Sequence, residues 1–209
     1  MNGIAETRPA GSSDFGRLEP GFADPVRDAQ SCFRAILDAM AHPGRIVKLP
    51  VSLAGAPPAP LGSAATSIAL ALCDLDTPVW LDEAAGAAAS YIAFHCGAPL
   101  ATIPGEARFA FIADPSILPP LDSFALGSDE YPERSATLVI EVAGLTGDDG
   151  AVLRGPGIRD EIRLGVIGVP GRFWTERAAL AELFPRGLDI LFVTGDTLAA
   201  LPRSTHIAL

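Results

Sequence analysis

Apolar residues recur with the period of a helix in one early segment, residues 24–41. They fall three or four positions apart and form a single stripe: Val26, Ala29, Phe33, Ile36, Leu37 and Met40. Asp24 can accept hydrogen bonds from the first free N–H groups, and Pro25 suits the first helical position. Pro43 and Gly44 end the pattern, because proline disfavours a helical residue before it and glycine permits a reversal. The pattern predicts an amphipathic helix.

The rest of the chain alternates between short helical and short extended patterns. Helices are expected at 63–75, which is apolar nearly all round, and at 83–97 and 172–184. The sequence TGDDG at 146–150 is rich in residues that accept positive φ and predicts a hairpin turn. Strands are expected at 45–49, 77–81, 107–113, 136–145, 151–155, 161–169 and 188–195, and from Thr197 to the end.

This order of elements predicts the fold class. Helices interleave with strands early and late, and hairpins fill the middle, which indicates an α/β domain with a mixed sheet covered by helices on both faces. We expect one domain over residues 23–209. Residues 1–22 are rich in Gly, Ser and Pro without periodicity, and we expect a flexible N-terminal arm there.

Charge and composition narrow the classes of partner and location. The formal net charge of −10 argues against nucleic acid, whose phosphates the average surface would repel. No apolar run reaches the roughly 18–20 residues that cross a bilayer, so we expect no membrane partner. The three cysteines are widely spaced and have no C-x-x-C pair. Together with the absence of a signal-peptide pattern, this predicts a cytoplasmic protein with reduced thiols.

Several common chemical motifs are absent. The sequence GPGIRD at 155–160 begins like a dinucleotide fingerprint but lacks its third glycine and opens no predicted helix, so a tight turn is favoured. Isolated histidines give no metal-binding pattern. Asp74 and Asp76 suit a structural cap better than a magnesium site, although the sequence leaves their role open. Lys48 is the only lysine, and it lies in an early strand that we expect at a solvated edge.

The C-terminal stretch LPRSTHIAL places four polar residues in succession, namely Arg203, Ser204, Thr205 and His206. In an extended strand, Arg203 and Thr205 would face one side, and Ser204 and His206 the other. An edge strand with outward polar residues and a site for an anionic ligand therefore both remain open on the pattern. A frayed tail is disfavoured, because apolar residues flank the stretch.

The chain resembles the PhnH family, whose members are subunits of the carbon-phosphorus lyase system of bacteria. The resemblance rests on seven segments in the same order: DAQSCFRAILDAMAHPG, LCDLDTPVWL, FHCGAPL, YPERSATLVIEV, GPGI, FPRGLD and LPRSTH. They cover roughly residues 22–207. Arg186 in FPRGLD departs from the apolar residue of the family pattern.

The resemblance implies a fold and a role. It implies a three-layer α/β/α fold similar to that of pyridoxal-phosphate-dependent transferases, without that cofactor; the isolated histidines separately lead us to expect no metal. It also implies a homodimer in isolation and a complex with PhnG, PhnI and PhnJ subunits. The expected function is phosphonate catabolism, supporting the formation of ribose 1-phosphonate 5-triphosphate from ATP and phosphonate as a structural or ligand-binding component, not catalytic alone.

Matching the family motifs implies a candidate anion site, since a turn with free N–H groups beside an arginine fork can bind phosphate or phosphonate. Its candidate residues are Arg203, Ser204, Thr205, His206, Gly155, Gly157, Tyr131 and Glu133. With the resemblance, the anion site is favoured over the edge strand. The alternative function is a stand-alone enzyme or binding protein for a phosphorylated small molecule, with His206 as acid or base. A transferase using Lys48 as its Schiff-base residue is a third hypothesis.

Overall fold

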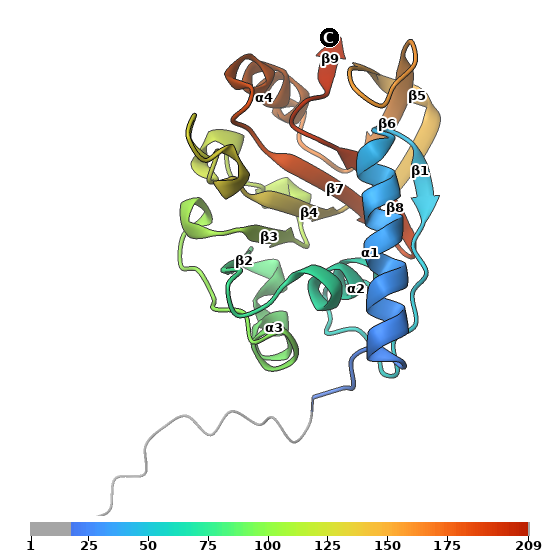
Figure 1. The fold of residues 1–209 in the computed structure, drawn as a ribbon, viewed down its shortest axis with the longest axis vertical. Helices are drawn as coiled ribbons and strands as arrows, with labels where there is room; N and C mark the ends of the chain where they lie inside the picture. The colour runs from blue at the N-terminus through green and yellow to red at the C-terminus, as the bar shows by residue number, and fades with distance from the viewer. Residues whose placement is uncertain (1–17, 209) are drawn as a thin grey trace, which may run out of the picture.

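The computed structural model describes residues 18–208 of the chain, and a mixed six-stranded sheet forms its centre (Figure 1). Its strand order is β1-β8-β7-β4-β3-β2. The strands β2 (Val79–Leu81), β3 (Phe109–Ile112), β4 (Thr137–Glu141) and β7 (Asp189–Thr194) run parallel. Strand β8 (Thr197–Leu201) pairs antiparallel with β7, and β1 (Ile46–Lys48) pairs antiparallel with β8. The predicted α/β class with a mixed sheet is confirmed.

The central strands are apolar because both of their faces are covered. In β4, Val139 packs into the core on one face of the sheet, and Leu138 and Ile140 pack into the core on the other. A strand buried on both sides has no reason to alternate with polar residues. The continuous apolar runs of β4 and β7 follow from this position.

Three helices cover one face of the sheet. These are α1 (Pro25–Ala41), α2 (Ser63–Leu72) and α3 (Ala89–Cys96), whose buried residues share one core with that face. As predicted, α2 buries nearly its whole first half, and the Asp24 side chain caps α1 by accepting from the N–H of Arg27 at 3.1 Å.

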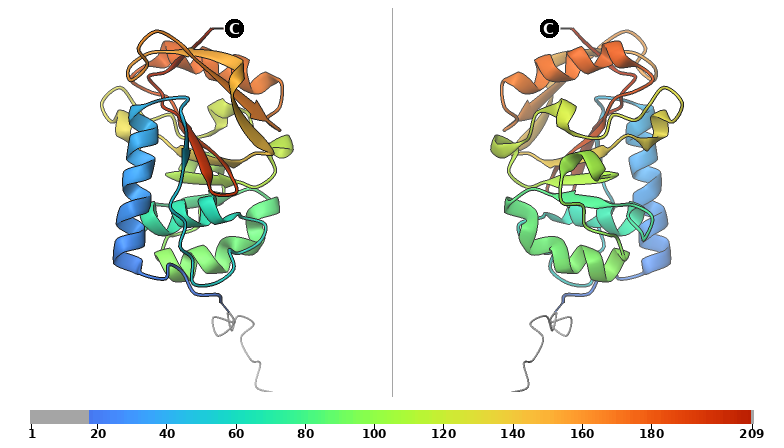
Figure 2. Two further views of the ribbon diagram at one scale, coloured as in Figure 1. Left: turned by 90° about the vertical axis from the view of Figure 1, so that its right-hand side faces the viewer. Right: turned by 90° about the vertical axis from the view of Figure 1, so that its left-hand side faces the viewer.

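The other face carries helix α4 (Arg172–Leu180) and a second sheet, which the sequence patterns did not predict. This sheet has the order β6-β5-β9 and is antiparallel, with β5 (Gly144–Arg154) in the middle between β6 (Ile162–Ile167) and β9 (His206–Ala208). In both views of Figure 2, α4 and this sheet lie at the opposite end of the molecule from α3.

The predicted hairpin turn at 146–150 was wrong. The TGDDG segment is no hairpin turn: it lies within β5, at a bulge where the pairing with β6 shifts between Thr146 and Ala151. The β5–β6 turn is instead the Gly-Pro-Gly segment that begins at Gly155. Glycine at 150 explains the confusion, because φ is +101° there and serves the bulge as well as it would serve a turn.

The predicted apolar stripe of α1 was only partly correct, because only part of it is buried. The helix buries Cys32, Ile36 and Ala39, whereas Val26 is 80% exposed, Leu37 56% and Phe33 49%. Helix α1 packs on α2 and β8 through one narrow face, so the outer half of the predicted stripe has no cover among the described residues.

Most of the predicted N-terminal arm, residues 1–17, lies outside the described residues. The last residue of that segment, Phe22, is 9% exposed and forms a bridge with Leu53. No helix within 18–208 is both long enough and apolar enough to span a membrane.

Candidate functional site

A tight turn, not a strand, carries the first polar residues of the C-terminal stretch. Strand β8 ends at Leu201, and the N–H of Thr205 donates to the carbonyl of Pro202 at 3.0 Å, which reverses the chain before β9 begins at His206. The expected alternation of side chains along 203–206 was therefore wrong. Proline at 202 explains it, because it supplies no N–H for strand pairing and favours a turn.

The Arg203 side chain is already engaged within the protein. Its Nε lies 3.3 and 3.2 Å from the two carboxylate oxygens of Asp189, its Nη2 pairs with the same carboxylate, and its Nη1 donates to the carbonyl of Pro132. The backbone N–H of Arg203 also donates to Asp189, at 2.8 Å. The two side chains are only 19% and 14% exposed. This guanidinium therefore has little capacity left for an external anion.

A second arginine, Arg177 of α4, forms hydrogen bonds with the backbone of the same turn. It is 1% exposed, and its Nη2 donates to the carbonyls of Pro202 at 2.6 Å and Thr205 at 3.3 Å. Burial lowers the pKa of Arg177 to about 10, and the charge of Asp189 opposes that shift. Sequence reasoning missed Arg177, although it stands four residues after Phe173 and three before Leu180 on the buried side of α4.

The other predicted residues of the C-terminal stretch do not form one cavity with Arg203. Thr205 is fully buried, so its hydroxyl cannot reach a surface ligand, whereas His206 is exposed and lies opposite Arg154 in the β5–β9 pair. Ser204 is half-buried.

The Tyr131–Glu133 loop meets Arg203 only through the backbone of Pro132. The Tyr131 ring lies under the guanidinium of Arg134 at 4.1 Å. Glu133 lines a separate cavity of about 370 Å³ with Asp76 and Arg108, and its backbone carbonyl accepts from Nη1 of Arg108 at 3.1 Å.

The Gly-Pro-Gly turn lies against two other segments of the chain. Gly155 has φ +140°, and a Cβ there would meet the carbonyl oxygen of Ser204 at 2.9 Å. Gly157 has φ +83°, and a Cβ there would overlap the carbonyl oxygen of Ala41 and meet Cδ of Pro43 at 2.8 Å. Only glycine fits such an approach. The turn therefore joins the C-terminal turn to the end of α1.

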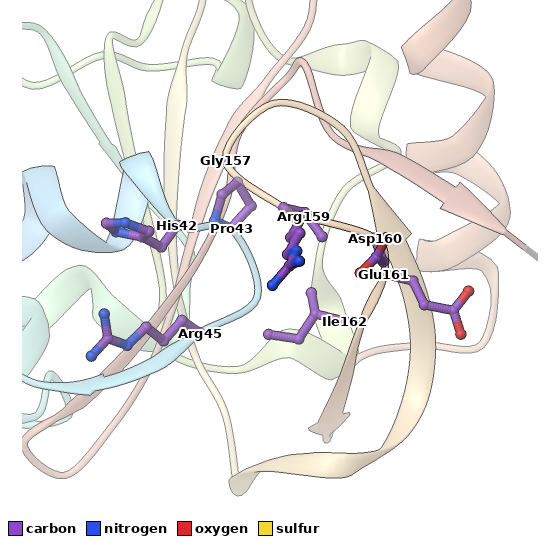
Figure 3. Close-up of a pocket in the computed structure, with 9 residues that line it drawn as sticks. His42, Pro43, Arg45, Gly157, Arg159, Asp160, Glu161 and Ile162 are labelled. Carbon is purple, nitrogen blue, oxygen red and sulfur yellow. The ribbon is translucent and has the colours of Figure 1, made fainter.

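A cavity of about 280 Å³ opens at the junction of α1 and the Gly-Pro-Gly turn (Figure 3). The end of α1 contributes His42, Pro43 and Arg45, and the turn and the start of β6 contribute Gly157, Ile158, Arg159, Asp160, Glu161 and Ile162. In Figure 3 the Glu161 carboxylate points away from the other labelled side chains.

Ion pairs orient part of this lining. Nδ1 of His42 lies 3.2 Å from one carboxylate oxygen of Asp38, and Nη1 of Arg45 lies 3.8 Å from the other. Glu161 accepts from Nη2 of Arg154 at 2.8 Å, and this hydrogen bond lowers the pKa of Glu161. Among the described residues, Arg159 is exposed and has neither a hydrogen bond nor an ion pair.

The residues that the sequence left open have structural partners. Lys48 forms an ion pair with Asp196 at 2.9 Å, and Asp74 accepts from the N–H of Asp76 at 2.9 Å within a turn closed by Thr77. Across residues 18–208, no group of three or more His, Cys, Asp and Glu side chains is arranged to hold a metal ion.

Comparisons with known proteins match nearly the whole described chain. Residues 20–208 match the model of the family described as bacterial phosphonate metabolism protein (PhnH). One relative, the alpha-D-ribose 1-methylphosphonate 5-triphosphate synthase subunit PhnH of Rhizobium meliloti (strain 1021), is 47% identical over 188 residues, which is 89% of this chain and 93% of the relative. HtxG of Stutzerimonas stutzeri, named as a C-P lyase subunit, is 33% identical over 182 residues, 86% of each chain. The protein therefore belongs to the PhnH family of bacterial phosphonate metabolism proteins.

Proposed function

We propose that this chain is the PhnH-type subunit of a carbon-phosphorus lyase complex and supports the formation of a ribose 1-phosphonate 5-triphosphate from ATP and a phosphonate. The observation that carries the proposal is the 47% identity over nearly the whole domain to a relative named as a subunit of that synthase. We propose a structural or ligand-binding role, in the cytoplasm, with PhnG, PhnI and PhnJ-type subunits as partners and a homodimer in their absence.

The chemistry of the described side chains supports a non-catalytic role. The reactive form of cysteine is the thiolate. Burial raises the pKa of the Cys32 thiol to about 12 and that of Cys96 to about 11, and it also raises the pKa of Cys73. All three stay protonated at neutral pH and make poor nucleophiles.

The only lysine is equally unsuited to Schiff-base chemistry. A Schiff-base lysine needs a lowered pKa. Lys48 is 79% exposed, and its hydrogen bond to Asp196 raises its pKa instead. We therefore propose that the chain uses no pyridoxal phosphate, and that its resemblance to pyridoxal-phosphate-dependent transferases, with three α/β/α layers in one domain over 23–209, lies in the fold alone.

We expect a partner subunit to bind the outer face of α1. Val26, Phe33 and Leu37 expose apolar surface along one line of the helix. Single exposed apolar residues are ordinary, but three in line on one helix are typical of interaction surfaces. This feature supports assembly without identifying which subunit covers it.

Co-purification tests the proposal. The tagged full-length chain, expressed with the PhnG, PhnI and PhnJ subunits of the same organism, should elute with them as one species on size-exclusion chromatography. A Phe33→Asp change should weaken this association, whereas Arg27→Asp, at an 87% exposed position of the same helix, is the matched control. A wild-type chain that elutes free of all three subunits would refute the proposal.

A stand-alone role on a phosphorylated small molecule is the second candidate, and the cavity beside Arg159 is the observation that favours it. This role predicts that the isolated chain turns over ATP plus methylphosphonate and that Arg159→Ala lowers this turnover. His206, the acid or base expected from the sequence, does not line the cavity, so His206→Ala tests that expectation separately. Product formed only when the partner subunits are present would exclude it.

A further inference from the structure

We propose that the free edge of strand β6, together with a cavity beside it, binds an extended segment of a different subunit that carries an arginine or a lysine. The inference rests on the proposed function, because it gives one partner of the complex a location and a chemistry. The surface is separate from the outer face of α1, since α1 and the second sheet pack on opposite faces of the six-stranded sheet.

Strand β6 is an edge strand of the second sheet. It pairs with β5 on one side, and no strand within residues 18–208 pairs with its other side. An edge strand presents unpaired N–H and C=O groups with which an extended peptide can pair. Many proteins block such edges with charged residues or proline. The half of β6 that ends at Ile167 has neither, and Ile167 is 56% exposed.

A cavity of about 480 Å³ lies beside this half of β6. The end of β6 forms one wall, the bulge of β5 with Asp148 and Asp149 forms another, and Trp174 of α4 contributes an aromatic ring. The bulge approaches β6 closely because Gly165 has no side chain: a Cβ there would overlap Oγ1 of Thr146 and lie 3.0 Å from the carbonyl oxygen of Asp149. The cavity is therefore preformed, which lowers the entropy lost when a partner binds.

The charge of this cavity is negative and is not compensated. Asp148 and Asp149 are its only charged lining residues, both are exposed, and neither forms an ion pair within the part of the chain that the structure describes. Asp149 accepts one hydrogen bond, from the N–H of the next residue at 2.8 Å. The cation of β6, Arg163, lies outside the cavity near Glu161, whose pKa is lowered chiefly by its hydrogen bond to Arg154 and also by the charge of Arg163. Two free carboxylates favour a cationic side chain from outside.

Trp174 is a second and independent feature that favours a protein partner. The residue is half-buried, its ring lies edge-on to Phe173 with the centroids 5.1 Å apart, and its indole N–H has no acceptor among the described residues. Tryptophan N–H groups usually find an acceptor when an interface buries them, and tryptophan is enriched among the residues that dominate binding energy. An arginine or lysine is also attracted to the face of an indole ring.

A second copy of this chain is a less suitable occupant than a different subunit. Two copies, each with a formal net charge of −10, repel one another, and the arginine on the same edge, Arg163, is already close to Glu161. A basic segment of another subunit is complementary in charge. The homodimer proposed for the isolated chain would then use another surface.

Photocrosslinking in the assembled complex identifies the occupant. The full-length chain carrying Ile167→p-benzoylphenylalanine is co-expressed with the PhnG, PhnI and PhnJ-type subunits of the same organism and irradiated. We expect a crosslink to one of these subunits, and mass spectrometry should place it beside an arginine or lysine. A crosslink between two copies of this chain, or none in the assembled complex, would overturn the inference.

Removal of the two charges tests the chemistry of recognition. Asp148→Asn/Asp149→Asn keeps oxygen acceptors but removes both charges. Interferometry with the immobilised full-length chain and the three co-purified subunits should show affinity weakened by about tenfold to a hundredfold at low salt, as expected for lost charge-assisted hydrogen bonds. The affinity of the variant should also depend less on NaCl concentration than that of the wild type.

The matched control is Asp122→Asn/Glu130→Gln, which removes two exposed carboxylates outside the cavity that have no ion pair among the described residues. It should bind like the wild type, and thermal unfolding should give equal melting temperatures for all three chains. Equal affinity of the wild type and the Asp148/Asp149 variant, or an equal loss in the control, refutes this inference and leaves the proposed function intact. A wild-type chain that associates with none of the subunits refutes both.

Discussion

Two arginine clusters lie on either side of the Gly-Pro-Gly turn, and they differ in how much of their hydrogen-bonding capacity is used. The guanidinium of Arg203 is surrounded by Asp189 and the carbonyl of Pro132, and Arg177 below it is fully buried. Arg159, across the turn, is exposed with no partner among residues 18–208. An arginine committed to the fold stabilises a turn, whereas an uncommitted one is available to a ligand.

The largest expected effect is a loss of stability when Arg203, whose side chain is bonded within the protein, is replaced. Arg203→Ala removes the principal partner of the largely buried Asp189, and breaking such a pair costs about 3 kcal/mol. For a domain of this size, the melting temperature should fall by roughly 6–12 °C. Thermal unfolding followed by circular dichroism measures the shift. An unchanged melting temperature would show that the Arg203 side chain contributes as little to stability as the exposed Arg159 side chain. That result would contradict the difference between the two clusters.

A substitution in the Gly-Pro-Gly turn, which lies between the two arginine clusters, gives the next largest effect. Gly157→Ala places a methyl group on the carbonyl of Ala41 and requires a φ of +83°, so we expect a loss of about 2 kcal/mol. Gly147→Ala is the matched control, because a Cβ there has open space. Equal melting temperatures for the two variants would contradict the close contact.

The half-buried carboxylate of Glu141 extends the comparison to the dependence of stability on pH. Burial raises the pKa of Glu141, although the N–H of Gly62, at 2.6 Å, partly opposes the shift. A raised pKa in the folded state means that the stability from this group is present at acid pH and is lost as pH rises through that pKa.

Glu141→Gln keeps the hydrogen-bond acceptor without the charge. The variant should therefore gain stability relative to wild type as the pH rises above 4.5, the ordinary pKa of a glutamate. Denaturant unfolding at several pH values measures the gain, and Glu130→Gln, at an exposed position, is the control. A stability difference that stays constant with pH would show that the Glu141 carboxylate is not penalised by burial.

The smallest effect on stability is expected when the exposed Arg159 is replaced. Arg159→Ala should change the free energy of unfolding by less than about 0.5 kcal/mol, because an exposed side chain without partners contributes little to stability. Chemical denaturation measures it. A loss comparable to that of Arg203→Ala would mean that Arg159 supports the fold and is not reserved for a ligand.

Local sequence patterns predicted most of the helices and strands, but not which side of each packs against the rest of the protein. The period of α1, its cap at Asp24 and the apolar runs of β4 and β7 all depend on near neighbours in the chain. Which side of α1 is buried depends instead on where β8 and α2 lie, so Phe33 could not be distinguished from Ile36 by spacing.

The candidate site divides in the same way. The Gly-Pro-Gly turn was recognisable, because positive φ leaves a signature in residue type. The pairing of Arg203 with Asp189 was not, since it joins the turn after β8 to the first residue of β7, 14 positions earlier in the chain. Nor could spacing show that His42 and Arg159, more than half the chain apart, line one cavity.

The pairing of β1 with β8 affects how the chain is made as well as how it is held. Ile46 pairs with Ala199, so within residues 18–208 the edge strand β1 of the six-stranded sheet pairs with a strand 153 positions later in the chain. Contacts so distant in sequence slow folding, and a growing chain must leave this edge open until β8 leaves the ribosome. The six-stranded sheet can therefore be completed only after β8 has been synthesised.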